Sequence, residues 1–146
     1  MGRVQPEQAE RLQAADGRPA SRILIVEDDE YIRALACAAL ADDGYDVLEA
    51  ANGAAALDLI KLYPPSLIIL DMNMPVMNGW EFVRRYRQLP FPHAPIIVFT
   101  AAGDAALRAA EIDASGILGK PFDLDDLSAL VRKYVQPSRP RRKDPR

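Results

Sequence analysis

Several features that would define a class of protein are absent from this 146-residue chain. A single cysteine, Cys37, rules out a disulfide framework, and a single histidine, His93, rules out a histidine-rich metal site. No apolar run approaches the roughly 18 residues that cross a bilayer, and the first residues lack the apolar core of a signal peptide. We therefore expect a cytoplasmic protein that does not bind membranes.

Glycine-rich phosphate loops are also missing, since neither GxGxxG nor GxxxxGK(S/T) occurs. The turn after the first apolar run is instead Glu27-Asp28-Asp29-Glu30, which would repel a phosphate and attract a cation. Charge is unevenly distributed: residues 137–146 carry +4 and residues 22–136 carry −7 within a net charge of −3. An acidic central region argues against direct binding of nucleic acid.

Strand and helix signals alternate between residues 22 and 136, which we expect to form one domain. Residues 1–21 are expected to be a flexible arm, and residues 137–146 a basic, proline-rich, flexible tail. Five βα repeats with continuous apolar strands predict an α/β fold, in which helices cover both faces of a parallel sheet. The expected strands are Arg22–Val26, Asp46–Ala50, Leu67–Leu70, Ile96–Thr100 and Gly116–Gly119. The expected helices are Asp29–Asp42, Gly53–Leu62, Trp80–Leu89, Asp104–Glu111 and Leu124–Val135.

Four of the apolar runs end on residues that can carry chemistry. These residues are Glu27 with Asp28, Asp71, Thr100 and Lys120. Parallel strands bring such residues to one carboxyl edge, where open α/β sheets place their sites. Carboxylates about 4 Å apart repel by roughly 4 kcal/mol at an effective dielectric near 20, and Mg²⁺ would compensate for this repulsion. The pattern therefore predicts a magnesium site that contains Asp28 and Asp71.

The remaining residues of this edge suit a phosphoryl group. An acyl phosphate on Asp71 would carry nearly two negative charges, which Mg²⁺, the Thr100 hydroxyl and the Lys120 ammonium could share. Each residue alone has a simpler explanation: Asp28 or Asp29 could cap a helix, Thr100 could end a strand, and Lys120 could be a solvated charge. Their coincidence at successive strand ends favours a phosphoryl site.

Four segments resemble the receiver domain of two-component response regulators across residues 22–136. They are Ile23–Asp29, Leu67–Pro75 with Asn78-Gly79, Ile96–Ala101 and Lys120–Phe122. The resemblance implies a flavodoxin-like (βα)5 doubly wound parallel sheet with strand order 2-1-3-4-5. It also implies that Asp71 accepts a phosphoryl group from the phosphohistidine of a histidine kinase or histidine phosphotransfer protein.

Further roles follow from the same resemblance. Mg²⁺ would be bound by Asp28, Asp71 and the backbone carbonyl of Asn73, with Glu27 acting through water. Thr100 would be the switch hydroxyl and Lys120 the phosphoryl-binding ammonium; Ala101 would leave room for the phosphoryl group, and Pro75 and Gly79 would shape the loop after the acceptor.

Two departures from the family pattern concern the transmission of the signal. Ile117 stands three residues before Lys120, where family members often have a tyrosine or phenylalanine that turns inward with the switch threonine. The stretch from Thr100 to Gly116 is also about two residues shorter than usual, in a region that belongs to the usual output surface. The sequence therefore leaves open whether the switch works with Ile117 in place of an aromatic residue.

We expect a stand-alone receiver that binds a downstream protein in trans or passes its phosphoryl group onward, because no output domain fits after Val135. It would catalyse only its own phosphotransfer and dephosphorylation. One alternative is a receiver-like binding module that ignores phosphorylation. Another is a phosphatase of the haloacid dehalogenase type, although Asn73 replaces the second aspartate of that site. A phosphorylation-dependent homodimer could form through charged residues of the last two helices: Arg108, Asp123, Asp125, Asp126, Arg132 and Lys133.

Overall fold

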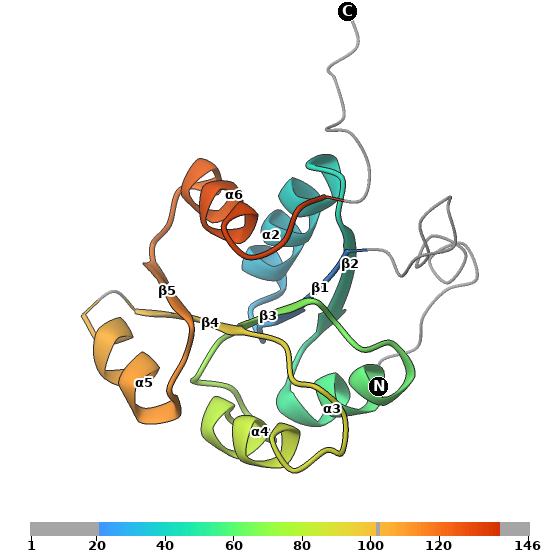
Figure 1. Ribbon diagram of the computed structural model, residues 1–146. Helices are drawn as coiled ribbons and strands as arrows, with labels where there is room; N and C mark the ends of the chain where they lie inside the picture. Colours follow the sequence, from blue (N-terminus) through green and yellow to red (C-terminus); the bar gives the residue numbers. More distant parts are fainter. Residues whose placement is uncertain (1–20, 102, 138–146) are drawn as a thin grey trace, which may run out of the picture.

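The computed structural model describes residues 21–101 and 103–137 (Figure 1). Strands and helices alternate along this part of the chain, as expected from the sequence. The order is β1 (Arg22–Val26), α2 (Glu30–Asp42), β2 (Asp46–Ala50), α3 (Gly53–Leu62), β3 (Leu67–Leu70), α4 (Gly79–Tyr86), β4 (Ile96–Ala101), α5 (Ala105–Ile112), β5 (Gly116–Lys120) and α6 (Leu124–Arg132). The expected arm and tail lie almost entirely outside the described residues.

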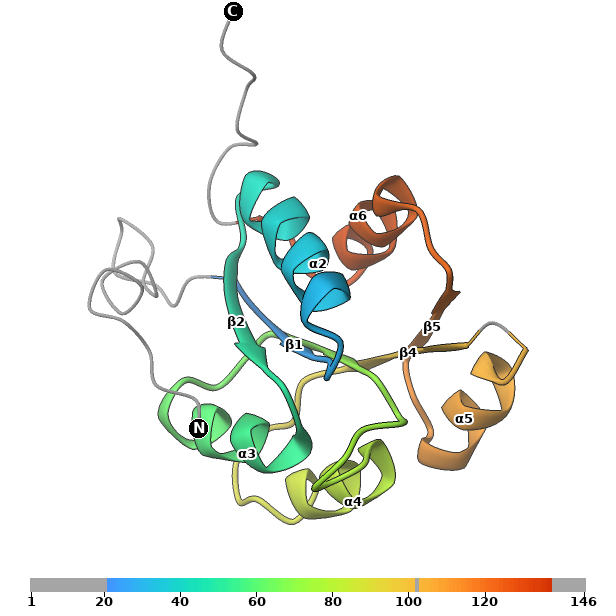
Figure 2. The same ribbon diagram turned by 180° about the vertical axis from the view of Figure 1, so that it is seen from behind.

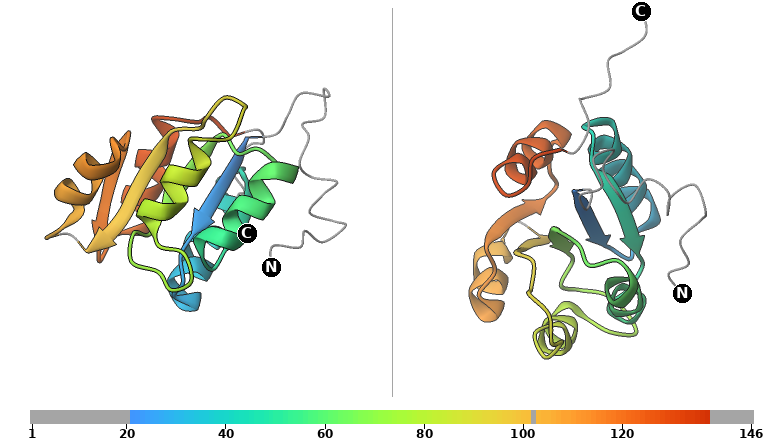
Figure 3. Two further views of the ribbon diagram at one scale, coloured as in Figure 1. Left: turned by 90° about the horizontal axis from the view of Figure 1, so that it is seen from below. Right: turned by 45° about the vertical axis from the view of Figure 1, so that its right-hand side comes forward.

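The five strands form one parallel sheet in the order β2-β1-β3-β4-β5, which confirms the predicted fold (Figure 3). β1 lies between β2 and β3 in the sheet. Its last residue, Val26, is in register with Ala50 of β2 and Leu70 of β3. The residues that follow β1 and β3 therefore leave the sheet side by side.

Helices cover both faces of the sheet. α2 and α6 lie on one face, and α3, α4 and α5 lie on the other (Figures 1 and 2). Successive residues of β1 contribute to opposite faces: Ile23 and Ile25 pack with α2 and α6, whereas Leu24 and Val26 pack with α3 and α4. This two-sided burial accounts for the continuous apolar run, since both faces of the strand exclude water.

Two helices end earlier than the sequence pattern predicted. The helix expected to reach Leu89 ends at Tyr86, where Leu89 N–H bonds to the Tyr86 carbonyl in a tighter turn just before Pro90. The helix expected to reach Val135 ends at Arg132 and is followed by a similar turn. Within the described ranges, no helix has the length and hydropathy needed to cross a membrane.

Candidate metal and phosphoryl site

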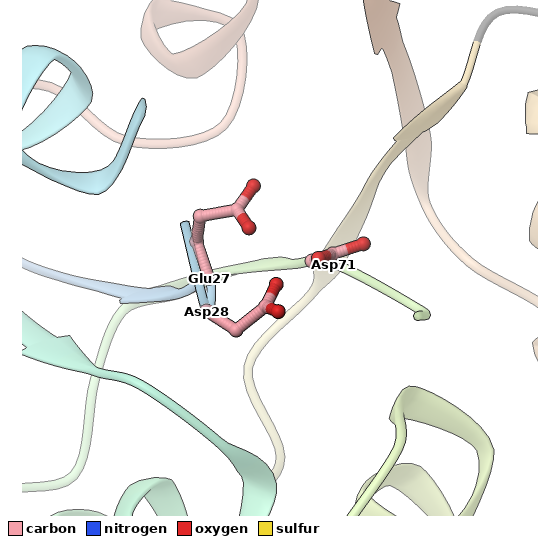
Figure 4. Close-up of side chains that lie close together, drawn as sticks. All are labelled: Glu27, Asp28 and Asp71. Atoms are coloured by element: carbon pink, nitrogen blue, oxygen red, sulfur yellow. The ribbon is translucent and has the colours of Figure 1, made fainter. Parts of the chain in front are cut away.

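Three carboxylates gather at the carboxyl edge of the sheet. Glu27 and Asp28 follow β1, and Asp71 follows β3. The backbone N–H of Asp71 donates to the Val26 carbonyl at the end of β1, at 2.9 Å. One ligand oxygen from each of the three acids lies within 4.8 Å of the others (Figure 4). The structure thus brings together the acids that the sequence pattern placed at one edge.

The neighbouring acid, Asp29, caps a helix and does not belong to this cluster. Its side chain caps α2 by accepting a hydrogen bond from Ile32 N–H at 3.0 Å. Its own backbone N–H donates to Glu27 Oε2, also at 3.0 Å, which orients the Glu27 carboxylate. The choice that the sequence left open between Asp28 and Asp29 is therefore resolved: Asp29 caps the helix and Asp28 belongs to the acidic cluster.

Burial differs sharply within the cluster. Glu27 and Asp71 are buried, whereas Asp28 is exposed. The pKa of Asp71 is raised to about 7: burial raises it most, the Asn73 backbone N–H at 3.1 Å lowers it, the Glu27 charge raises it and the Lys120 charge lowers it. Crowded carboxylates with one exposed member are an oxygen-rich, anionic site, which fits the ligand preference of Mg²⁺.

Lys120 reaches the cluster from β5, at the far side of β4. Its ammonium lies 2.5 Å from Glu27 Oε1 and 3.6 Å from Asp71 Oδ2, and it sits 4.7 Å from the centre of the Phe99 ring. It is therefore not the solvated charge that the sequence alone allowed. The contact also places a cation where the oxygens of a phosphorylated Asp71 would need one.

Thr100 is buried near the end of β4 and contacts the loop that follows the acceptor. The Asn73 side-chain amide donates to Thr100 Oγ1 at 3.4 Å, while the Asn73 backbone N–H bonds to Asp71 Oδ1. Asn73 thus touches both the acceptor and the hydroxyl. Reasoning from sequence gave Asn73 only a carbonyl ligand role, although an amide side chain two residues after the acceptor was a visible signal.

The segment Met72–Asn78, which we call the acceptor loop, is held at both ends. Gly79 N–H bonds to the Met72 carbonyl at 3.1 Å, and a Cβ at Gly79 would lie only 2.8 Å from Met72 Cα. Between these ends, Met77 N–H bonds to the Pro75 carbonyl across Val76, whose φ is 70°. Pro75 and Gly79 therefore lie at the tight points of the loop, as expected.

The departures from the family pattern lie on β5 and on the connection from β4 to α5, beside the site. Ile117 is 43% exposed on β5. Only residues 102–104 separate β4 from α5, and α5 itself has 8 residues. The surface beside the site is therefore built with a short helix and an aliphatic residue.

A cluster of acids with a buried aspartate, a hydroxyl and an ammonium, on a parallel sheet of order 2-1-3-4-5, is the arrangement of a receiver-type domain. Residues 23–132 match the sequence model of the response regulator receiver domain, and the chain belongs to this family. Receiver domains typically bind Mg²⁺ at an acidic pocket, and this chain has a cluster of acidic residues at the corresponding edge.

Individual relatives agree with this assignment. The chain is 36% identical over 116 residues to sporulation initiation phosphotransferase F of Bacillus subtilis (strain 168), covering 78% of this chain and 93% of that protein. It is 37% identical over 121 residues to the response regulator MprA of Mycobacterium sp. (strain KMS), covering 82% of this chain and 52% of that protein, so it spans about half the length of that regulator. A high-resolution structure of the chemotaxis response regulator CheY4 of Vibrio cholerae superposes with a TM-score of 0.72 at 32% identity, covering 80% of this chain and 99% of that one.

Proposed function

We propose that Asp71 accepts a phosphoryl group from the phosphohistidine of a histidine kinase or histidine phosphotransfer protein. The observation that carries this proposal is the buried pair of Glu27 and Asp71 with the Lys120 ammonium between them. The Lys120 ammonium holds the two acids close together and supplies one of the cations that a phosphoryl group requires. The signal then passes by phosphorylation-dependent binding of a partner or by onward transfer, and the relative named a phosphotransferase supports the second route.

In the proposed reaction, an Asp71 carboxylate oxygen attacks the phosphorus atom of the donor. The new O–P bond forms as the N–P bond breaks, and the electron pair of that bond returns to the imidazole nitrogen. Lys120 would bind one phosphoryl oxygen, and the Thr100 hydroxyl, whose oxygen accepts from the Asn73 amide, would donate its proton to another.

Magnesium has a defined place in this proposal. Asp28, Asp71 and the Asn73 carbonyl would hold the ion, with Glu27 acting through water; when bound, Mg²⁺ supplies positive charge against the phosphoryl oxygens. Because Asp28 is exposed, one ligand of the proposed site is open to solvent. We place the reaction in the cytoplasm, where a phosphohistidine donor of this system would meet the chain.

We further propose that the chain is a phosphoacceptor and not an enzyme with steady turnover. Its chemistry would end with self-catalysed transfer and slow hydrolysis of its own acyl phosphate. Asn73 supports this view, because an amide at that position cannot act as the general acid of an aspartate-dependent phosphatase. Sustained hydrolysis of p-nitrophenyl phosphate would contradict this part of the proposal.

Labelling of the intact chain by acetyl phosphate and Mg²⁺ tests the acceptor. We expect Asp71→Asn to abolish labelling, because the amide nitrogen is no nucleophile. Asp58→Asn is the matched control, since Asp58 is an exposed acid of α3 and should leave labelling unchanged. Undiminished labelling of Asp71→Asn would refute the assignment.

A further inference from the structure

Trp80, the second residue of α4, is bound by two side chains of α5. Its indole Nε1–H donates to Glu111 Oε2 at 2.5 Å, and the Arg108 guanidinium lies 5.0 Å from its ring centre. Arg108 also pairs with Glu111 Oε1 at 3.4 Å. We call these three residues the Trp80 clasp. An anionic acceptor and a stacked cation make both contacts stronger than neutral ones.

The clasp is joined closely to the acceptor loop. Trp80 directly follows Gly79, which bonds to the Met72 carbonyl and lies against the Met72 backbone without room for a methyl group. Met72 is buried and directly follows Asp71. Since buried, close-packed groups move together, a shift of the loop at Asp71 is carried to Trp80 through two short contacts.

The clasp also holds α5, a short helix that buries few of its own side chains. α5 is only 8 residues long, and it turns Ala105, Ala109 and Ile112 toward the core. Its Leu107 is 58% exposed. At the C-terminal end of both helices, an Arg87 guanidinium N–H donates to the Asp113 carbonyl at 3.3 Å. The C-terminal half of α5 is therefore tied to both ends of α4, and the Trp80 clasp is the tie nearer the acceptor loop.

We propose that Trp80 is a positioning residue that couples the acceptor loop to α5. This inference rests on the proposed function, since phosphorylation of Asp71 is the event that displaces the loop. Movement of the loop carries Trp80, and Glu111 and Arg108 carry α5 with it, by a route that needs no aromatic residue at Ile117. Coupling is reciprocal, so loosening α5 also weakens binding of Mg²⁺ to the loop.

The intact chain provides its own probe, because Trp80 is its single tryptophan. Trp80 emission, followed as Mg²⁺ is added, gives the metal affinity. Hydrogen exchange of the α5 amides, with and without Mg²⁺ and beryllofluoride, gives the response of the helix. Glu111→Ala breaks the clasp and keeps the fluorophore, whereas Trp80→Phe keeps an apolar ring and removes the N–H donor. Glu81→Ala is the matched control, because Glu81 is an acid of α4 whose ion pairs, within the part of the chain that the structure describes, are with Arg84 and Arg85 of the same helix segment.

We expect beryllofluoride to change α5 exchange in the unaltered chain and in Glu81→Ala, and to leave it nearly unchanged in both clasp variants. Glu111→Ala should also bind Mg²⁺ more weakly, by roughly two- to thirtyfold. If both clasp variants accept label from acetyl phosphate and still show the full α5 response, the inference is overturned and the proposed function stands. If the unaltered chain neither accepts label nor responds to beryllofluoride, the proposed function falls and the inference falls with it.

Discussion

The acceptor loop and the β4–α5–β5 edge, both next to the candidate site, are built in opposite ways. In the loop, Met72 and Met74 are buried, and Gly79, which directly follows the loop, has no room for a methyl group. At the edge, a Cβ at Gly103 would meet no atom within 4 Å, and Ile117 is partly exposed. Close packing transmits small displacements, whereas an open edge can change position or accept a partner at low cost. The loop is therefore closely packed at its anchor points, which we call the rigid side, and the edge is loosely covered, which we call the open side.

The largest expected effect tests the rigid side. Gly79→Ala would place a methyl group 2.8 Å from Met72 Cα, a backbone atom that cannot rotate away. We expect the free energy of unfolding to fall by about 3 kcal/mol, because the loop must shift to relieve the clash. Urea unfolding measures this change.

Gly103→Ala is the matched substitution on the open side, and it should change the unfolding free energy by less than about 0.5 kcal/mol. Similar costs at the two glycines would show that the loop and the edge do not differ in packing.

The second largest effect concerns the ionisation of the buried Asp71 carboxyl, next to the acceptor loop. The unfolded Asp71 carboxyl loses its proton near 3.8, whereas burial raises the folded pKa to about 7. Between these values the folded state holds more protons, so the unfolding free energy should fall as pH rises from about 4 to about 7. In EDTA, Asp71→Asn should lack this fall and exceed the unaltered chain at pH 8 by on the order of 2 kcal/mol. Urea unfolding of both proteins at pH 5 and pH 8 provides the comparison, and parallel pH dependences would exclude a raised pKa.

The sequence predicted the strands well because each is a short apolar run that ends on a polar residue. β4 and β5 each extend only one residue beyond the expected bounds, to Ala101 and Lys120. Helix ends were less predictable, because α4 and α6 finish in tight turns whose bonds depend on local geometry. The strand order came from the resemblance to a family, since spacing does not encode which strands are neighbours.

The site was predictable as a set of residues, and its internal contacts were not. Glu27, Asp71 and Lys120 stand at strand ends, so the parallel sheet alone brings them together. The bond from Asn73 to Thr100 and the bond from Trp80 to Glu111 join side chains 27 and 31 positions apart. Such pairs depend on how loops and helices pack, which periodicity does not report.

A smaller effect is expected within the acceptor loop itself. Val76 is 84% exposed and has a φ of 70°, in a region that a β-branched residue rarely adopts. Val76→Gly should raise the unfolding free energy by about 0.5 to 1 kcal/mol, because relief of strain exceeds the added entropy of the unfolded chain. Thermal unfolding measures the gain. A loss of stability would mean that the Val76 side chain makes contacts that outweigh its strain.

The smallest effect is expected on β5, where one strand contains both kinds of environment. Ile117 is 43% exposed and its neighbour Leu118 is buried on the opposite face. Ile117→Thr should change the unfolding free energy by less than about 0.5 kcal/mol, whereas Leu118→Thr should cost about 2 kcal/mol. If the signal passes through Trp80, Ile117→Thr should also keep the full response of α5 to beryllofluoride, measured by hydrogen exchange. Loss of that response in Ile117→Thr, with stability unchanged, would place the route on β5 and make this aliphatic residue a functional replacement for the usual ring.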